Sequence, residues 1–364
     1  MKRVVLILFA ILCLFSATAY AEEEMMRMAI EARERMLASF KAKQIPDDIA
    51  LTAARLTDND VPTREKAADA LLEHSDRKTV IAAMILAMKE DDNNKRPNAG
   101  TILVKIGADA LAPLVEALEV NEQRARATWA ISELGEAAKS AVPALIKLLK
   151  ADKPLAVADG AVALGVMGQN AKEALLPLID ALKNPDREVR AAVATAIKQI
   201  GPAPEHVALL LPHLQDPYMK VRSTITLTFG YMGDAGKPAI PEMMKHIKDE
   251  NSWVRMHTCA SLARFGADAK DAAPLLKEAL NDEAGVVRGN AAVALSKIAP
   301  SSDLVPDLIR LLQDPNERVR NLAEEAVVEV GKLALDDLSA AAGATTDPAL
   351  KTTLTELKRK IKAK

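Results

Sequence analysis

Small and apolar residues recur along this chain at fixed offsets from a repeated arginine. In the copy that begins at Arg222 they are Ile225, Thr226, Phe229 and Met232, which follow the arginine by three, four, seven and ten residues. These offsets describe one face of a helix and are incompatible with the two-residue alternation of a strand. Each copy of the arginine therefore predicts an amphipathic helix with one buried face.

The pattern occurs nine times, at spacings of 28 to 33 residues. Its anchor positions are Arg64, Arg96, Arg124, Val157, Arg190, Arg222, Arg255, Arg288 and Arg320. A second apolar run precedes each predicted helix, as in Ala273-Pro274-Leu275-Leu276, and a short turn rich in Asp, Asn and Pro joins the two. Proline suits the first turn of a helix, and Asp or Asn can cap the next one. We therefore predict an all-α solenoid in which each helix pair packs mainly on its neighbours.

The motifs resemble a known repeat family. A D-P-x-x-x-V-R motif and an A-A-x-A-L-x-x-I-G run are similar to HEAT repeats and, among them, to the short HEAT-like repeats named for phycobilisome lyases; the resemblance covers Asp47 to Gly331. It implies a right-handed, armadillo-like superhelix of about nine HEAT-type helix pairs with capping helices at both ends. Three copies depart from the motif, since Val157 replaces the arginine, Pro97 follows Arg96, and His74 replaces a hydrophobic residue.

The first 21 residues are predicted to be a signal peptide. Lys2 and Arg3 precede an apolar run over 4–17, and Ala19-Tyr20-Ala21 has the small-residue pattern of a cleavage site. The run is shorter than the roughly 20 residues that a transmembrane helix needs. We expect an exported protein, periplasmic or extracellular, with a retained membrane anchor as the alternative. Residues 22–46 then form an N-terminal capping helix, 47–331 the repeat array, and 332–364 a degenerate repeat with a basic C-terminal cap.

Composition narrows the partners. Hydrophobic residues make up 49% of the chain and the formal net charge is −2, so a large core is possible and the basic surplus that binds nucleic acid is missing. We expect a protein partner and no nucleic acid. Membrane contact is expected only through the signal segment or through the basic C-terminus around Lys358, Arg359 and Lys360.

The recurring arginines are interpreted as structural. The resemblance implies that each pairs with an Asp or Asn in a turn between helices, such as Asp216, Asp249 or Asp314, and so fixes how repeats stack. The arginines assigned to this ladder are Arg190, Arg222, Arg255, Arg288 and Arg320. A ligand-binding stripe of arginines is the alternative.

Catalytic motifs are missing from the sequence. The five histidines show no H-E-x-x-H or comparable ligand spacing, and the repeated His-Glu pairs of the HEAT-like deoxyhypusine hydroxylases do not occur. Cys259 occupies a buried-face position. We therefore predict no enzyme activity, no metal and no cofactor. A lyase- or hydroxylase-like role by family analogy, and an envelope element that binds lipid or polysaccharide, remain as alternatives.

Function is expected instead on the outward positions of the second helices, two, five and nine residues after the arginine. In solenoids of this kind the second helices line the concave side, and exposed aromatic and arginine side chains there would be suited to binding. The residues assigned to partner binding are Arg126, Trp129, Glu133, Tyr231, His257, Arg264 and Lys297. Burial of the same side chains against neighbouring repeats is the alternative. The prediction is an exported protein-binding scaffold or adaptor.

Overall fold

The structure is a computed structural model that describes residues 24, 26–90 and 97–363. The predicted signal peptide at 1–21, with Cys13, and the anchor Arg96 lie outside these residues. Throughout the described ranges the regular structure is helical and contains no strand, which confirms the all-α solenoid. The chain divides into two compact units, unit 1 over 1–170 and unit 2 over 171–364.

Unit 1 holds the first helix pairs. A helix over residues 26–42 precedes them. The pairs are formed by α2 (Asp47–Ala54) with α3 (Val61–Glu73), α4 (Arg77–Ala87) with α5 (Ala99–Ile106), α6 (Leu111–Ala117) with α7 (Asn121–Glu133), and α8 (Val142–Leu148) with α9 (Pro154–Met167).

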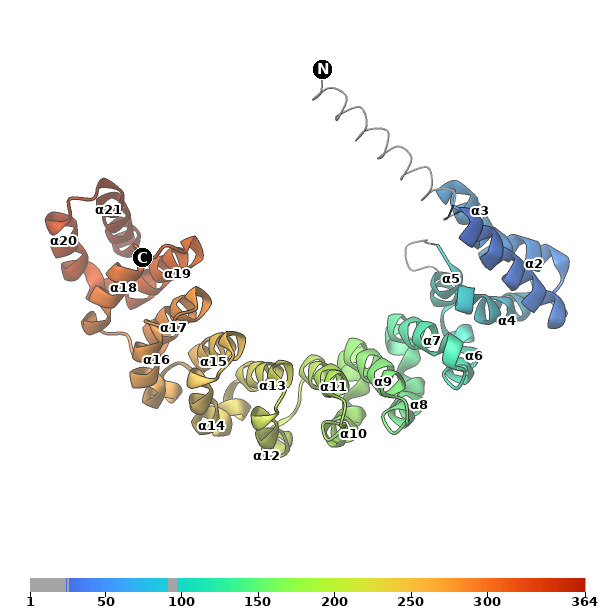
Figure 1. Cartoon of the computed structure of the whole chain (residues 1–364), viewed down its shortest axis with the longest axis horizontal. Helices are drawn as coiled ribbons and strands as arrows, with labels where there is room; N and C mark the ends of the chain where they lie inside the picture. The colour runs from blue at the N-terminus through green and yellow to red at the C-terminus, as the bar shows by residue number, and fades with distance from the viewer. Residues whose placement is uncertain (1–23, 25, 91–96, 364) are drawn as a thin grey trace, which may run out of the picture. The chain divides into compact units, whose positions relative to one another are not determined.

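Unit 2 continues the same alternation of a shorter first helix and a longer second helix. Its elements are α10 (Leu175–Ala181), α11 (Arg187–Ile200), α12 (Val207–Leu210), α13 (Met219–Tyr231), α14 (Ile240–Lys245), α15 (Ser252–Phe265), α16 (Ala273–Ala279), α17 (Gly285–Ile298), α18 (Val305–Leu311), α19 (Glu317–Val330), α20 (Leu335–Ala344) and α21 (Pro348–Ala363). Within this unit the second helices, α11 to α19 in odd numbers, form one layer and the first helices α10 to α18 form the other (Figure 1).

The core of each repeat comes from the face that the sequence pattern predicts. In α17 the residues three, four, seven and ten positions after Arg288 are all buried, namely Ala291, Ala292, Leu295 and Ile298. Alanine at the first two positions lets adjacent second helices approach closely, and α17 packs against both α15 and α19. Each repeat therefore buries its apolar face only when its neighbours are present.

The helix ends follow ordinary capping chemistry. Asn316 accepts a hydrogen bond from the backbone N–H of Arg318 at the start of α19, which satisfies one of the free donors there. At the end of the same helix Gly331 has φ +67°, a left-handed conformation that a side chain would strain. The turn at each end is thus fixed by the local sequence.

The two ends of the described chain are helical. Helix 26–42 buries Met36 and Phe40, while Met26 and Met28 in its first turn are exposed. At the other end α20 and α21 pack together, and α21 buries Leu350 and Leu354 along one face. Among the described helices, none combines the length and the apolar character needed to cross a membrane.

Candidate functional site

The recurring arginines of unit 2 form a regular set of ion pairs, which we call the Arg–Asp ladder. Each guanidinium binds both carboxylate oxygens of an aspartate 26 or 27 residues later, in the turn of the next repeat. The pairs are Arg190 with Asp216, Arg222 with Asp249, Arg255 with Asp282, and Arg288 with Asp314, at N–O distances of 2.7 to 3.0 Å. This two-pronged geometry uses the planar fork of arginine, which lysine cannot reproduce.

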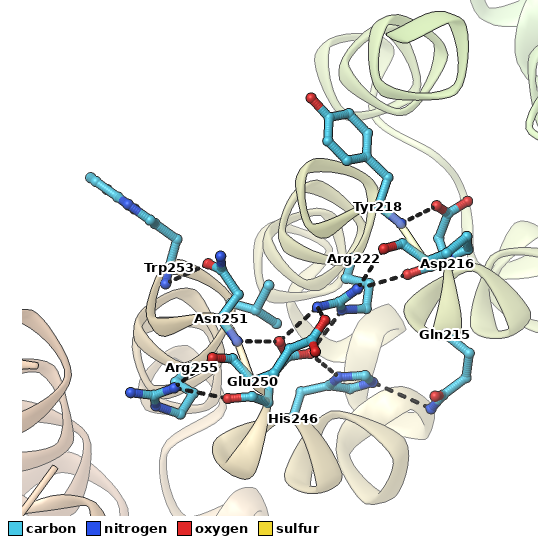
Figure 2. A network of polar contacts seen from close by, with 12 residues as sticks. Gln215, Asp216, Tyr218, Arg222, His246, Glu250, Asn251, Trp253 and Arg255 are labelled. Carbon is cyan, nitrogen blue, oxygen red and sulfur yellow. Dashed lines mark hydrogen bonds and ion pairs between the residues drawn. The ribbon is translucent and has the colours of Figure 1, made fainter. Parts of the chain in front are cut away.

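Each rung also holds its own turn in place. Arg222 Nη1 donates to the carbonyl oxygens of Asp216 and Pro217, at 2.9 and 3.2 Å, while Asp249 accepts the backbone N–H of Asn251 (Figure 2). One guanidinium therefore ties the turn before its helix to the turn of the following repeat. The side chains of Arg222 and Asp249 are only 8% and 6% exposed, so the pair is shielded from water.

Electrostatics agree with this geometry. Burial alone would raise the pKa of Asp249, but hydrogen bonds from Arg222, the Asn251 N–H and His246 outweigh it and hold the pKa below the usual range. The hydrogen bonds from Arg288 likewise lower the pKa of Asp314, against the opposing effect of burial. Both carboxyl groups are therefore charged at neutral pH, and their charge is neutralised by arginine.

A side branch extends the ladder at one rung. His246 Nδ1 lies 3.3 Å from Asp249 Oδ2, and its Nε2 lies 3.5 Å from Gln215 Nε2 (Figure 2). Gln215 donates in turn to Glu242 at 2.7 Å. The buried imidazole thus serves as a link within a hydrogen-bonded network, which accounts for it without a catalytic role.

The ladder is incomplete at its predicted end. Arg320 donates to the carbonyl oxygens of Asp314 and Pro315, as the other arginines do in their own turns, but within the described residues it forms no ion pair. Asp347 stands 27 residues later, yet its Oδ1 accepts the N–H of Ala349. The first helix between them, α20, has 10 residues where α18 has seven. The longer helix changes where the next turn lies, so the sequence spacing alone does not form this rung.

The outward side chains of α13, α15 and α17 lie on a different surface, which we call the second-helix face. It comprises Thr224, Leu227, Tyr231, His257, Ala260, Arg264, Asn290, Val293 and Lys297. Tyr231 is 62% exposed, and the guanidinium carbon of Arg264 lies 4.1 Å from the centre of its ring. This cation–π contact joins α13 to α15 and orients both side chains while leaving them accessible.

A shallow cavity of about 250 Å³ opens beside this pair, between α11, α13 and α15. Trp253, 55% exposed, lies at one side with its ring 6.1 Å from that of His257. His257 Nδ1 is hydrogen-bonded to the hydroxyl of Ser223, and burial lowers the pKa of the imidazole. The cavity therefore presents an indole and a neutral imidazole at pH 7.

Two further groups complete the description of unit 2. Lys297 Nζ lies 3.8 Å from a carboxylate oxygen of Glu325 on α19, so its charge is shared. Near the start of α13, Tyr218 donates to Glu188, and the Arg187 and Lys220 cations lie 5.1 and 5.3 Å from the centre of its ring.

In unit 1 the predicted binding residues have a different setting. Arg126 and Trp129 are half-buried on α7, and Glu133 at the end of that helix is exposed. On the adjacent α9, Val162 and Val166 are exposed, while burial raises the pKa of Asp159. The packing of α7 against α9 brings these residues onto neighbouring helices of one unit.

Some features of the site were missed by the sequence. The outward positions predict Tyr231, His257 and Arg264 as separate candidates, but not the Tyr231–Arg264 stack or the cavity beside Trp253. Ser223 and Thr195, which line the cavity, lie one residue outside or in an unremarkable copy of the pattern. The spacing of 33 residues between Tyr231 and Arg264 equals one repeat, and that equality is the signal that would have predicted their contact.

Chemistry at the remaining candidates is limited. Cys259 is fully buried, and burial raises the pKa of its thiol to about 12, so it is a protonated core residue at neutral pH. In the described part of the chain no cluster of three or more His, Cys, Asp or Glu side chains is arranged to hold a metal. The cationic C-terminal side chains are exposed apart from Lys358, which is half-buried, and Lys360 lies 3.6 Å from Glu324.

Comparison with known families agrees with this architecture. A family model for HEAT repeats matches residues 142–229 and 207–296, and one for the PBS lyase HEAT-like repeat matches residues 123–151. The protein contains HEAT repeats. The family predicted from the D-P-x-x-x-V-R motif is thereby confirmed. No curated protein sequence matches this HEAT-repeat chain.

Solved structures show the same fold. A crystal structure of a Kap121p mutant and one of Kap121p match with TM-scores of 0.53 and 0.52, each at 14% identity over 91% of this chain. The HEAT-repeat chain spans 41% and 45% of the length of those two chains. At this level of identity the likeness concerns the α-solenoid fold alone.

Proposed function

We propose that this HEAT-repeat protein is a non-catalytic scaffold that binds a protein partner on the second-helix face of unit 2. The observation that carries the proposal is the exposed Tyr231 side chain held against Arg264. Aromatics make up only 3% of the chain, and the core is filled mainly by Ala, Leu, Ile and Val. An exposed tyrosine and an exposed tryptophan near one another are therefore unlike the rest of the molecule.

Physical chemistry favours a protein ligand for this surface. Tyr, Trp and Arg are the residue types that dominate binding energy in protein interfaces, because they combine a large apolar area with polar groups. The stack between Tyr231 and Arg264 restricts both side chains before a partner arrives, so less rotamer entropy is lost on binding. Thr224 and His257 add hydrogen-bonding groups nearby.

The proposal is tested by capture of partners from an envelope extract with the wild-type chain and two variants. Tyr231→Ala is expected to reduce recovery of the specific partner at least tenfold, the usual effect of removing a central aromatic anchor. Leu209→Ala, which removes an exposed leucine from the first-helix layer, is the matched control and is expected to change nothing. Equal recovery by all three proteins, with equal thermal midpoints, would refute this face as the binding site.

Export is a second part of the proposal. It is supported by the basic start, the apolar run over 4–17 and the Ala19-Tyr20-Ala21 sequence. The expected mature chain begins at Glu22, which intact-mass measurement of protein purified from the periplasm or the medium will detect. Recovery of the full-length chain from the cytoplasm alone would contradict this part and leave the binding face untouched.

A further inference from the structure

The gap between the first helices α4 and α6 in unit 1 is open and apolar. It forms a groove of about 760 Å³ whose walls are aliphatic. The apolar side chains that line it are Ile45, Ile81, Ile85, Leu86, Pro113 and Val120. This groove lies on the first helices, so it is distinct from the proposed partner-binding face of unit 2.

Corresponding gaps elsewhere are crossed by polar side chains. Lys147 after α6 bonds to Glu119 at 2.7 Å, Lys248 reaches Glu278 at 2.6 Å, and Gln215 reaches Glu242 at 2.7 Å. Within the described residues no ion pair joins α4 to α6. The α4–α6 gap is therefore the place where the repeat architecture leaves aliphatic surface open, although exposed surface pairs of this kind contribute little stability themselves.

Cations gather at one end of the groove. Arg77 and Lys78 are the first two residues of α4, and Lys43 belongs to the segment before α2. In the part of the chain that the structure describes, none of the three forms an ion pair; Arg77 Nη1 donates to the carbonyl of Leu72 at 2.7 Å. Asp109 and Glu116 also line the groove, so the lining carries three positive and two negative groups.

The charges and the apolar surface are separated along the helix. Leu86 follows Lys78 by eight residues, which corresponds to about 12 Å along α4. Ile81, Ala82 and Ile85 lie between them, one or two turns from the cations. The groove thus offers a cationic end followed by an aliphatic channel.

We propose that this groove binds the single acyl chain of a free long-chain fatty acid, with its carboxylate near Arg77 and Lys78. The volume falls in the range of sites that hold one small molecule. The lining contains no aromatic side chain, whereas protein anchors prefer aromatic pockets, so flexible aliphatic chains fit its chemistry better than a peptide. Burial of successive methylenes supplies the affinity, and the cations select the anionic head.

The proposal predicts a dependence on chain length and on head group. Displacement of a fluorescent fatty acid from the full chain is measured with octanoate, dodecanoate and hexadecanoate below their micelle concentrations. Affinity is expected to rise with length, by at most about fourfold for each added methylene. Hexadecanol is expected to bind more weakly than hexadecanoate because it has no charge for the cations to select.

Two substitutions separate the two ends of the groove. Ala82→Glu puts a carboxylate on exposed α4 surface inside the groove and is expected to weaken hexadecanoate binding at least roughly tenfold, since the charge must lose water. Lys78→Glu is expected to weaken hexadecanoate binding while leaving hexadecanol binding unchanged. Ala340→Glu, at an exposed alanine of α20 in unit 2, is the matched control with no expected effect.

Three results would overturn the proposal. One is the lack of saturable binding at any chain length, and another is equal hexadecanoate binding by the wild type, Ala82→Glu and Ala340→Glu. The third is binding only to phosphatidylglycerol vesicles and not to free hexadecanoate, which would assign the surface to a membrane. None of these outcomes bears on the Tyr231 face, so the two proposals fail independently.

Discussion

In unit 2 four successive arginines each grip an aspartate in the next turn, whereas in unit 1 Arg124 binds groups of its own turn. Arg124 Nε donates to the carbonyl of Leu118, its Nη2 bonds to Asn121, and no ion pair forms among the described residues. Val157 occupies the following arginine position and has no charge. The same repeat motif therefore connects neighbouring turns in one unit and stabilises single turns in the other.

This difference teaches that the arginine of the motif has two separable tasks. Binding the carbonyls of its own turn needs only the local backbone, and Arg124, Arg222 and Arg320 all do it. Reaching a carboxylate needs a first helix of the right length in the next repeat. The ion pairs make each repeat of unit 2 depend on its neighbour, which raises cooperativity along the array.

The largest expected effect comes from breaking one rung of the ladder. Arg222→Ala leaves Asp249 buried beside an empty space, so we expect the free energy of unfolding of unit 2 to fall by about 3–5 kcal/mol. Urea denaturation followed by circular dichroism measures it. A loss below about 1 kcal/mol would mean that the pair is no more than a surface contact.

Acid should weaken the ladder in a defined pH range. Asp249 and Asp314 have pKa values lowered below their ordinary range in the folded chain, so protonation favours the unfolded state. The stability from these groups is fully present above about pH 5 and is lost as the pH falls through about 4 toward the folded-state pKa values. Urea titrations between neutral and acid pH test this, and Arg222→Ala should flatten the dependence.

The smallest expected effect is at the arginines that serve only their own turns. Arg124→Ala and Arg320→Ala each remove neutral hydrogen-bond acceptors' partners, and we expect losses of about 1 kcal/mol. Equal losses at Arg124, Arg222 and Arg320 would erase the comparison between the units. The same urea assay, applied to all three variants, decides it.

Much of the fold could be predicted from the sequence because the repeat periodicity is a local signal. Offsets of three, four, seven and ten residues identify the buried face of α17, and a fixed spacing identifies Asp216, Asp249 and Asp314 as partners. Arg320 departs because the length of α20 is not part of the motif. Sequence spacing specifies a rung only when the intervening helix has the standard length.

The candidate site was harder to predict because exposure depends on neighbouring repeats. Trp129 and Tyr231 occupy equivalent outward classes in the sequence pattern, yet Trp129 is half-buried and Tyr231 is largely exposed. The α4–α6 groove was not predicted at all, since it results from a missing polar bridge between two helices. Such features arise from several side chains that are distant in sequence.

The proposed role of the second-helix face is tested most directly by photocrosslinking in the intact cell. Tyr231→p-benzoylphenylalanine places the reactive group on that face, and Leu209→p-benzoylphenylalanine places it on the first-helix layer as the control. The account predicts one discrete crosslinked protein from position 231 and none from position 209. The same crosslinked protein from position 209 alone, or none from position 231, would contradict it.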